Sequence, residues 1–79
     1  MTVPRAVLDL RTHLGFDGPQ FAKVLGVSRQ TVSYWEKATY APSSTHLARM
    51  LSLARTSKAS DEIVETLNDA ITDGEEAAP

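Results

Sequence analysis

The sequence of 79 residues contains no cysteine, only two histidines, and few aromatic residues: two phenylalanines, two tyrosines and one tryptophan. Without cysteine, the chain can form neither a disulfide nor a thiolate metal site. No apolar run approaches the roughly 20 residues that a membrane-spanning helix needs. The first residues also lack the apolar stretch of a signal peptide. We therefore expect a cytoplasmic protein without membrane association.

Motifs for catalysis and for cofactor binding are missing as well. His13 has only Asp9 one helical turn away, and His46 stands alone, whereas a metal site needs three or four convergent ligands. The serines fall at predicted helix starts and in loops, so no nucleophile–base pair is indicated. No glycine-rich phosphate loop occurs. We expect no catalytic residue, no metal, no cofactor and no enzymatic activity.

The net charge of −2 conceals an uneven distribution along the chain. Residues 1–58 carry all eight basic residues against three acidic ones, a net charge of +5. Residues 59–79 carry seven acidic residues and no basic one, a net charge of −7. A basic body joined to an acidic end predicts two partner surfaces. For the acidic end alone, a chance run of solvated acids is the alternative interpretation.

Helical periodicity dominates the sequence, and the alternation typical of strands is nearly absent. Asp17 followed by Gln20 has the spacing of a capping box, and Ser28 and Ser60 also fit helix N-caps. The pattern predicts an all-α bundle of about five short helices, over residues 4–14, 18–25, 29–37, 44–56 and 61–72. We expect one folded domain over residues 1–72 and an acidic, disordered tail over residues 73–79.

Each predicted helix has an apolar face that would pack into a common core. In the helix over 18–25 this face is expected to consist of Phe21, Val24 and Leu25. The two C-terminal helices contribute two further faces: Leu47, Met50, Leu51 and Ala54 from the first, and Ile63, Val64, Leu67, Ala70 and Ile71 from the second.

Four residues between positions 22 and 35 have the spacing of a helix-turn-helix. Two short helices that meet at a sharp angle need a small residue where their backbones approach, and Ala22 fits that place. The turn between them needs a residue that tolerates positive φ, which Gly26 provides. The second helix needs apolar anchors, and Val32 and Trp35 provide them.

The opposite face of that second helix carries long hydrogen-bonding side chains. At 100° per residue, Gln30, Tyr34 and Lys37 point away from Val32, and Arg29 and Ser33 lie on one flank. Arginine can bind guanine O6 and N7 in the major groove, and glutamine can bind adenine N6 and N7. The face therefore predicts contacts with DNA bases, and a merely solvated helix face is the alternative.

These residues belong to a longer pattern that extends from Leu10 to Leu53. Its elements are Leu10-Arg11, Leu14-Gly15, Phe21-Ala22, Leu25-Gly26-Val27-Ser28, Thr31-Val32-Ser33, Trp35-Glu36, Pro42 and Leu47. The pattern resembles the Cro/repressor-like helix-turn-helix family, often called the XRE family. The resemblance implies a bundle of about five helices that binds double-stranded operator DNA, usually as a dimer.

The resemblance also assigns roles to individual residues. It places the base contacts at Arg29, Gln30 and Tyr34, with Ser33 nearby. It places the phosphate contacts beside the sugar-phosphate backbone, at Ser28, Thr31, Lys37, Thr39, Tyr40 and Ser44. In the family, Arg11 and Glu36 often form a buried ion pair, and two independent surface charges are the alternative. Many members have a glutamine where this chain has Gly18 and a glycine where it has Ala38.

Taken together, the sequence predicts a small, repressor-like transcriptional regulator. The third helix is expected to enter the major groove while the second lies across the backbone. We expect a homodimer, at least on DNA. An antitoxin-type or other protein-interaction module, whose acidic last helix and tail bind a protein partner, is the alternative function. A helix-turn-helix fold that no longer binds DNA is a third reading, which the outward Arg29, Gln30 and Lys37 disfavour.

Overall fold

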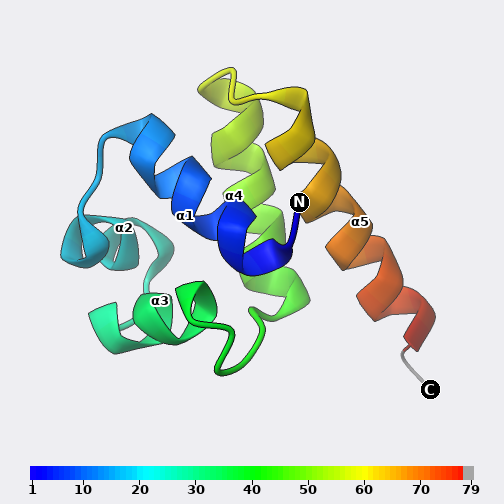
Figure 1. Ribbon diagram of the computed structural model, residues 1–79, viewed down its shortest axis with the longest axis horizontal. Coiled ribbons are helices and arrows are strands. Elements are labelled where there is room, and N and C mark those ends of the chain that lie inside the picture. The colour runs from blue at the N-terminus through cyan, green and yellow to red at the C-terminus, as the bar shows by residue number, and fades with distance from the viewer. Residues whose placement is uncertain (78–79) are drawn as a thin grey trace.

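The structure, a computed structural model, describes the backbone of residues 1–77 and the side chains of residues 1–73. Within these residues the chain forms five α-helices and no strand. Figure 1 shows how the helices are arranged. The helices are α1 (Val3–Leu14), α2 (Gly18–Leu25), α3 (Arg29–Glu36), α4 (Ser44–Thr56) and α5 (Asp61–Ala77). The all-α class predicted from the sequence is confirmed.

Side-chain caps fix where the helices begin. Asp17 Oδ1 accepts a hydrogen bond from the Gln20 backbone N–H at 2.8 Å, and Gln20 Oε1 accepts one from the Asp17 N–H at 2.9 Å. This confirms the predicted capping box, which satisfies N–H groups that have no partner inside the helix. Hydroxyl side chains cap the other helices: Thr2, Ser28, Ser43 and Ser60.

The five helices form two groups around α1. One group is the helical hairpin of α4 and α5, which pack along each other and are joined by residues 57–60. The other is the pair α2 and α3, which lies at the opposite side of the molecule from α5 (Figure 1). Helix α1 contacts α3, α4 and α5 and thereby connects the two groups. As a result, α3 and the acidic α5 lie on different sides of the protein.

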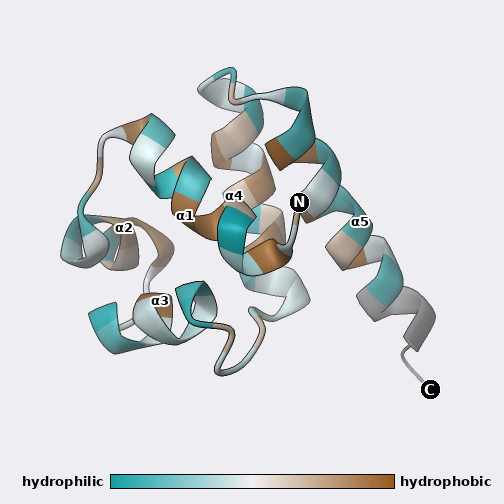
Figure 2. Cartoon of the chain, viewed as in Figure 1, coloured by the Kyte–Doolittle hydropathy of each residue, from teal (hydrophilic) through white to brown (hydrophobic). Residues whose placement is uncertain are grey.

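A single hydrophobic core lies between these helices. In Figure 2, hydrophobic positions appear as brown segments on the ribbons of the helices. Every helix contributes to it, so no helix is stable without its neighbours. The buried apolar residues are Ala6, Val7, Leu10, Phe21, Ala22, Leu25, Val32, Trp35, Leu47, Met50, Leu51, Ala54, Ile63 and Leu67. The predicted face of α4 is buried in full, and that of α5 is buried at Ile63 and Leu67 and partly buried elsewhere.

The prediction for α2 was wrong at Val24, whose side chain is 49% exposed. The buried residues of this helix are Phe21, Ala22 and Leu25. Ala22 turns the buried face towards α3, and at 100° per residue Val24 then lies at the edge of that face and points to solvent.

The ends of three helices also differ from the prediction. Helix α1 begins one residue earlier, at Val3, and α3 ends one residue earlier, at Glu36. Helix α5 continues past Thr72 to Ala77, so the predicted disordered tail is wrong for residues 73–77, while residues 78–79 lie outside the described residues. A glycine inside a helix costs only about 1 kcal/mol, and the two glutamates and the alanine after Gly74 have high helix propensity.

Candidate nucleic-acid interface

The turn between α2 and α3 is held by backbone geometry and by one distant side chain. Gly26 adopts the left-handed conformation, with φ of 73°, and the Val27 N–H donates to the Ala22 carbonyl at 2.9 Å. Ala22 is buried where α2 and α3 meet. Arg49 Nη1, on α4, donates to the Leu25 carbonyl at 3.1 Å and so satisfies an acceptor at the end of α2. Local spacing predicted the glycine and the alanine but not Arg49, whose partner is distant in sequence.

The inner face of α3 is anchored in the core. Val32 and Trp35 are almost completely buried, and the Trp35 ring lies 5.3 Å from the ring of His46 between centroids. Burial of these two side chains fixes the rotation of α3 about its axis. The opposite face of the helix is therefore presented to solvent in a defined orientation.

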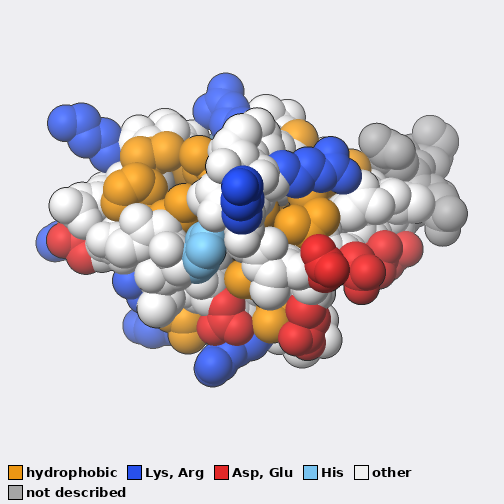
Figure 3. Space-filling model, turned by 90° about the horizontal axis from the view of Figure 1, so that it is seen from above, with side chains coloured by type: hydrophobic (Ala, Val, Ile, Leu, Met, Phe, Trp, Pro, Cys, Tyr) orange, Lys and Arg blue, Asp and Glu red, His pale blue; other side chains and the backbone are white. Residues whose placement is uncertain are grey.

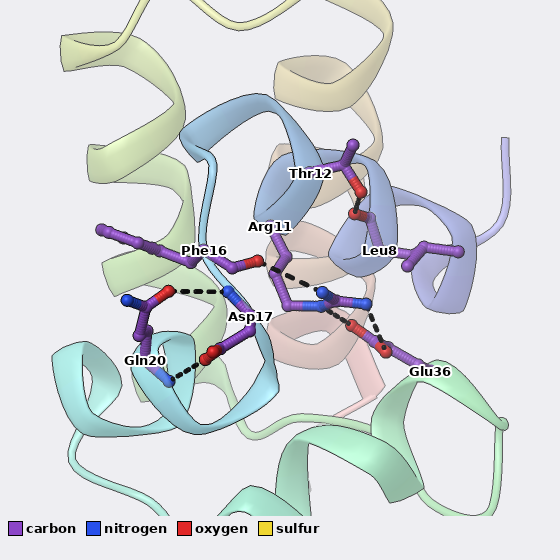
Figure 4. A network of polar contacts seen from close by, with 7 residues as sticks. All are labelled: Leu8, Arg11, Thr12, Phe16, Asp17, Gln20 and Glu36. Atoms are coloured by element: carbon purple, nitrogen blue, oxygen red, sulfur yellow. Dashed lines mark hydrogen bonds and ion pairs between the residues drawn. The ribbon is translucent and has the colours of Figure 1, made fainter.

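An ion pair ties the end of α3 to α1 (Figure 4). The Arg11 guanidinium donates to both carboxylate oxygens of Glu36, at 2.7 Å and 3.3 Å, and to the Phe16 carbonyl at 3.2 Å. The hydrogen bond to Glu36 raises the pKa of Arg11, against a smaller lowering by burial. The side chains remain 22% and 18% exposed, so the pair is shielded from water but not fully buried.

The outer face of α3 presents the residues for which base contacts were predicted. Arg29, Gln30 and Lys37 are exposed, and Ser33 and Tyr34 are half-buried. Gln30 Nε2 donates to the Tyr34 hydroxyl at 2.5 Å. A groove of about 500 Å³ runs between this face and the start of α2, lined by Gly18, Pro19, Arg29, Gln30 and Ser33. Gly18 has open space where a side chain would stand.

The residues with predicted phosphate contacts separate into two sets. Lys37, Thr39 and Ser44 are exposed, and the structure brings none of them into a described side-chain hydrogen bond. Ser28, Thr31 and Tyr40 lie together instead. Ser28 Oγ and Thr31 Oγ1 are 2.9 Å apart, and the Tyr40 hydroxyl donates to Thr31 Oγ1 at 3.5 Å.

A hollow of about 370 Å³ lies beside that second set, between α3 and the start of α4. Ser43 and His46 line it, and the sequence interpretation assigned neither residue to the site. Ser43 Oγ accepts from the His46 backbone N–H at 3.4 Å and lies 2.9 Å from His46 Nδ1. The pairing is a local helix cap, which the Ser-x-x-His spacing could have indicated.

The segment after α3 turns sharply at Ala38. This alanine has a φ of 60°, the left-handed conformation that favours glycine, and it stands where many members of the resembling family have glycine. The Thr39 N–H donates to the Tyr34 carbonyl at 2.9 Å and closes the turn. A non-glycine residue in this conformation costs about 1–2 kcal/mol, so the turn keeps its shape against local strain.

Charge divides the surface in the same way as it divides the sequence. The acids of α5 from Asp61 to Asp73 are exposed, and Figure 3 shows acidic side chains gathered towards the C-terminal end of the molecule. Helix α3 bears one acid, Glu36, which is engaged by Arg11 on the inner side. The exposed face of α3 with Arg29 therefore carries no acidic residue of its own and favours a polyanion.

The described part of the chain holds neither a metal-binding cluster nor a membrane-spanning helix. No group of three or more histidine, aspartate or glutamate side chains there could hold a metal ion. None of the helices within residues 1–77 has the combined length and apolarity needed to cross a membrane.

A family model described as helix-turn-helix matches residues 8–59, which is more than half of the chain. The chain therefore belongs to the XRE-type helix-turn-helix family, and its domain is a DNA-binding helix-turn-helix. The match spans α2, the Gly26 turn and α3. Comparison with the curated proteins and with the solved structures finds no significant match.

Proposed function

We propose that the protein is a sequence-specific, repressor-like regulator of transcription, with α3 in the major groove and α2 across the backbone. The observation that carries the proposal is the contrast between the anchored inner face of α3 and its exposed, acid-free outer face. An α-helix fits the major groove, and its N-terminal residues contact base edges in this class of fold. Occupancy of a site that overlaps a promoter would exclude polymerase and so repress transcription.

Base recognition is assigned to the first turn of α3. Arg29 and Gln30 are consecutive, exposed and flank the groove at the start of α2. Arg29 has the geometry to bind a guanine through O6 and N7, and Gln30 an adenine through N6 and N7. Ser33 and Tyr34 lie one turn further along and complete the base-contacting face.

Phosphate contacts are assigned to the margins of that face. Lys37 and Thr39 follow α3 and Ser44 begins α4, and all three are exposed. Ser28 and Thr31 lie at the start of α3, where helix N–H groups favour an anion. Such contacts hold the helix in register on the duplex without selecting a sequence.

Two copies are expected on each operator. A single α3 reaches only a few base pairs, so one domain alone would discriminate weakly. Two copies on half-sites about one helical turn apart combine their binding energies. We therefore propose a homodimer on DNA and a two-fold symmetric operator.

Selection from random duplex DNA with the full chain tests this function. The expected result is an enriched motif of two inverted half-sites, each with adjacent guanine and adenine positions. A motif that occurs once, bound by one protein at saturation, would contradict the dimer and leave α3 recognition in place. A pool without enrichment would contradict sequence recognition. It would favour the alternative, in which the exposed acids of α5 bind a basic protein partner.

A further inference from the structure

Tyr40 folds back onto the recognition helix although it lies in the loop that follows it. Its ring centroid is 5.2 Å from that of Tyr34, with an interplanar angle of 57°. Its hydroxyl donates to Thr31 Oγ1 at 3.5 Å. The two contacts join the loop to two successive turns of α3. The sequence predicted a phosphate contact for Tyr40, whereas in the structure its side chain packs against α3.

The turn at Ala38 directs Tyr40 to this place. The left-handed φ of 60° and the hydrogen bond from the Thr39 N–H to the Tyr34 carbonyl reverse the chain directly after α3. Tyr40 is thereby brought back over the side of α3 that carries Thr31 and Tyr34. The strained alanine thus supports a contact with the DNA-binding face and is more than an irregular helix end.

The contact continues from Tyr40 to a base-contacting side chain. Tyr34, packed against Tyr40, accepts a hydrogen bond from Gln30 Nε2 at 2.5 Å. Gln30 is exposed and would otherwise sample many rotamers. One N–H of its amide is used on Tyr34, which leaves Oε1 and the second N–H for a base. These are the two groups that an adenine edge requires.

A fixed rotamer of the Gln30 amide in the free protein has a measurable effect on DNA affinity. A side chain that is already fixed in its bound rotamer loses less entropy on binding, which is worth about 3- to 10-fold in affinity for the matching base. Random DNA makes no base contact with Gln30, so its affinity does not benefit. The ordering therefore acts on specificity alone.

We infer that Tyr40 is a positioning residue for sequence recognition: it holds Tyr34, and through Tyr34 the amide of Gln30, in the orientation that contacts adenine. The inference rests on the proposed function of the outer face of α3. It assigns specificity to a loop residue that need not touch DNA itself.

Nuclear magnetic resonance of the free protein tests the ordering without DNA. Gln20 and Gln30 are the two glutamines of the sequence, and Gln20 is held in the capping box with Asp17. In Tyr40→Ala, the side-chain amide of Gln30 should become markedly more mobile in ¹⁵N relaxation, while that of Gln20 stays unchanged. Tyr40→Phe keeps the ring contact and should restore most of the order. Unchanged mobility of Gln30 in Tyr40→Ala would overturn the inference.

Binding measurements test the consequence. On the selected operator, Tyr40→Ala should lose about 3- to 10-fold in affinity, with random duplex affinity unchanged and adenine preference at the Gln30 position reduced. Tyr40→Phe should retain at least half of the discrimination. Equal losses on operator and random DNA would identify a phosphate contact and overturn the inference. Tyr40 is 44% exposed, so the variant is expected to fold, and its thermal unfolding checks this.

If the unmodified protein shows no preferred site, the proposed function fails, and the specificity role of Tyr40 fails with it. If the unmodified protein has a preferred site and Tyr40→Ala discriminates operator from random DNA as strongly as the unmodified protein, only the role of Tyr40 is overturned.

Discussion

The two faces of α3 are fixed by different means. On the inner face, Val32 and Trp35 are buried and Glu36 is paired with Arg11. On the outer face, Arg29 and Gln30 are exposed, and the Gln30 amide donates to the Tyr34 hydroxyl, whose ring packs against Tyr40. One short helix thus carries stability on one side and the proposed recognition on the other. Substitutions on each side should separate the two properties.

The largest effect is expected for Trp35→Ala on the inner face. Truncating a buried aromatic side chain costs about 3–5 kcal/mol, which approaches the whole stability of a small domain. Urea unfolding followed by circular dichroism should show a protein that is largely unfolded in buffer. Lys37→Ala, at the exposed residue directly after the same helix, is the matched control and should stay within about 0.5 kcal/mol of the unmodified protein. A stable Trp35→Ala variant would mean that α3 is not anchored by its inner face.

The ion pair gives the next effect on the same face. Arg11→Ala should lower the free energy of unfolding by about 1–3 kcal/mol, because it leaves Glu36 without its partner and the Phe16 carbonyl without a donor. Replacing Arg11 and Glu36 together by methionine and leucine should recover much of the loss. A double variant as unstable as the single one would show that the packing of the two side chains, not their charges, matters.

The raised pKa of Arg11 predicts how this contribution depends on pH. A group whose pKa is higher in the folded state contributes stability that is fully present below its ordinary pKa. That stability is lost only as the pH rises through the folded pKa, in strong alkali. The difference in stability between the unmodified protein and Arg11→Ala should therefore not fall between pH 7 and pH 9 through any titration of Arg11.

On the outer face, Arg29→Ala and Gln30→Ala should each cost about 1–3 kcal/mol of operator affinity and much less on random DNA. Their unfolding free energy should hardly change. Arg55→Ala is the charge-matched control, since Arg55 is exposed in the last turn of α4. Competition binding at constant salt provides the ratio of operator to random affinity. Equal losses of affinity on operator and on random DNA, for Arg29→Ala as for Arg55→Ala, would assign the effect to net charge.

The smallest effects concern the turns at the two ends of α3, and they should have opposite signs. Gly26→Ala places a side chain at φ of 73° and should lose about 1 kcal/mol, since the nearest atom, Arg49 Nη1, leaves room for the new carbon. Ala38→Gly relieves the same strain and should gain about 0.5–1 kcal/mol after the entropy of glycine is subtracted. Thermal unfolding measures both. A loss in Ala38→Gly would show that the left-handed turn is not strained.

The features that the sequence predicted correctly are those set by neighbouring residues. The capping box of Asp17 and Gln20, the left-handed Gly26 and the buried Trp35 each follow from local spacing. The resemblance to the family supplied the pair of Arg11 and Glu36, which composition alone does not reveal.

Other features depend on the tertiary fold, and local patterns did not reveal them. Arg49 reaches the Leu25 carbonyl only because α4 packs against α2, and Tyr40 reaches Thr31 only because the left-handed turn at Ala38 reverses the chain after α3. Val24 was misplaced because the buried face of α2 is set by its contact with α3, which shifts that face towards Ala22. The length of α5 was underestimated because the acidic residues after Thr72 were interpreted as a disordered tail.

Recognition by the outer face of α3 is tested most directly by a double-mutant cycle that combines a substitution of one side chain with the removal of one acceptor atom from the DNA. Replacing the operator guanine assigned to Arg29 with 7-deazaguanine removes the N7 acceptor and leaves the pairing intact. The unmodified protein should lose affinity for this DNA, while Arg29→Ala should bind it as well as it binds the natural operator. A coupling of about 1 kcal/mol or more between the two changes is the predicted result. Independent, additive losses would contradict a contact between Arg29 and the base in the major groove.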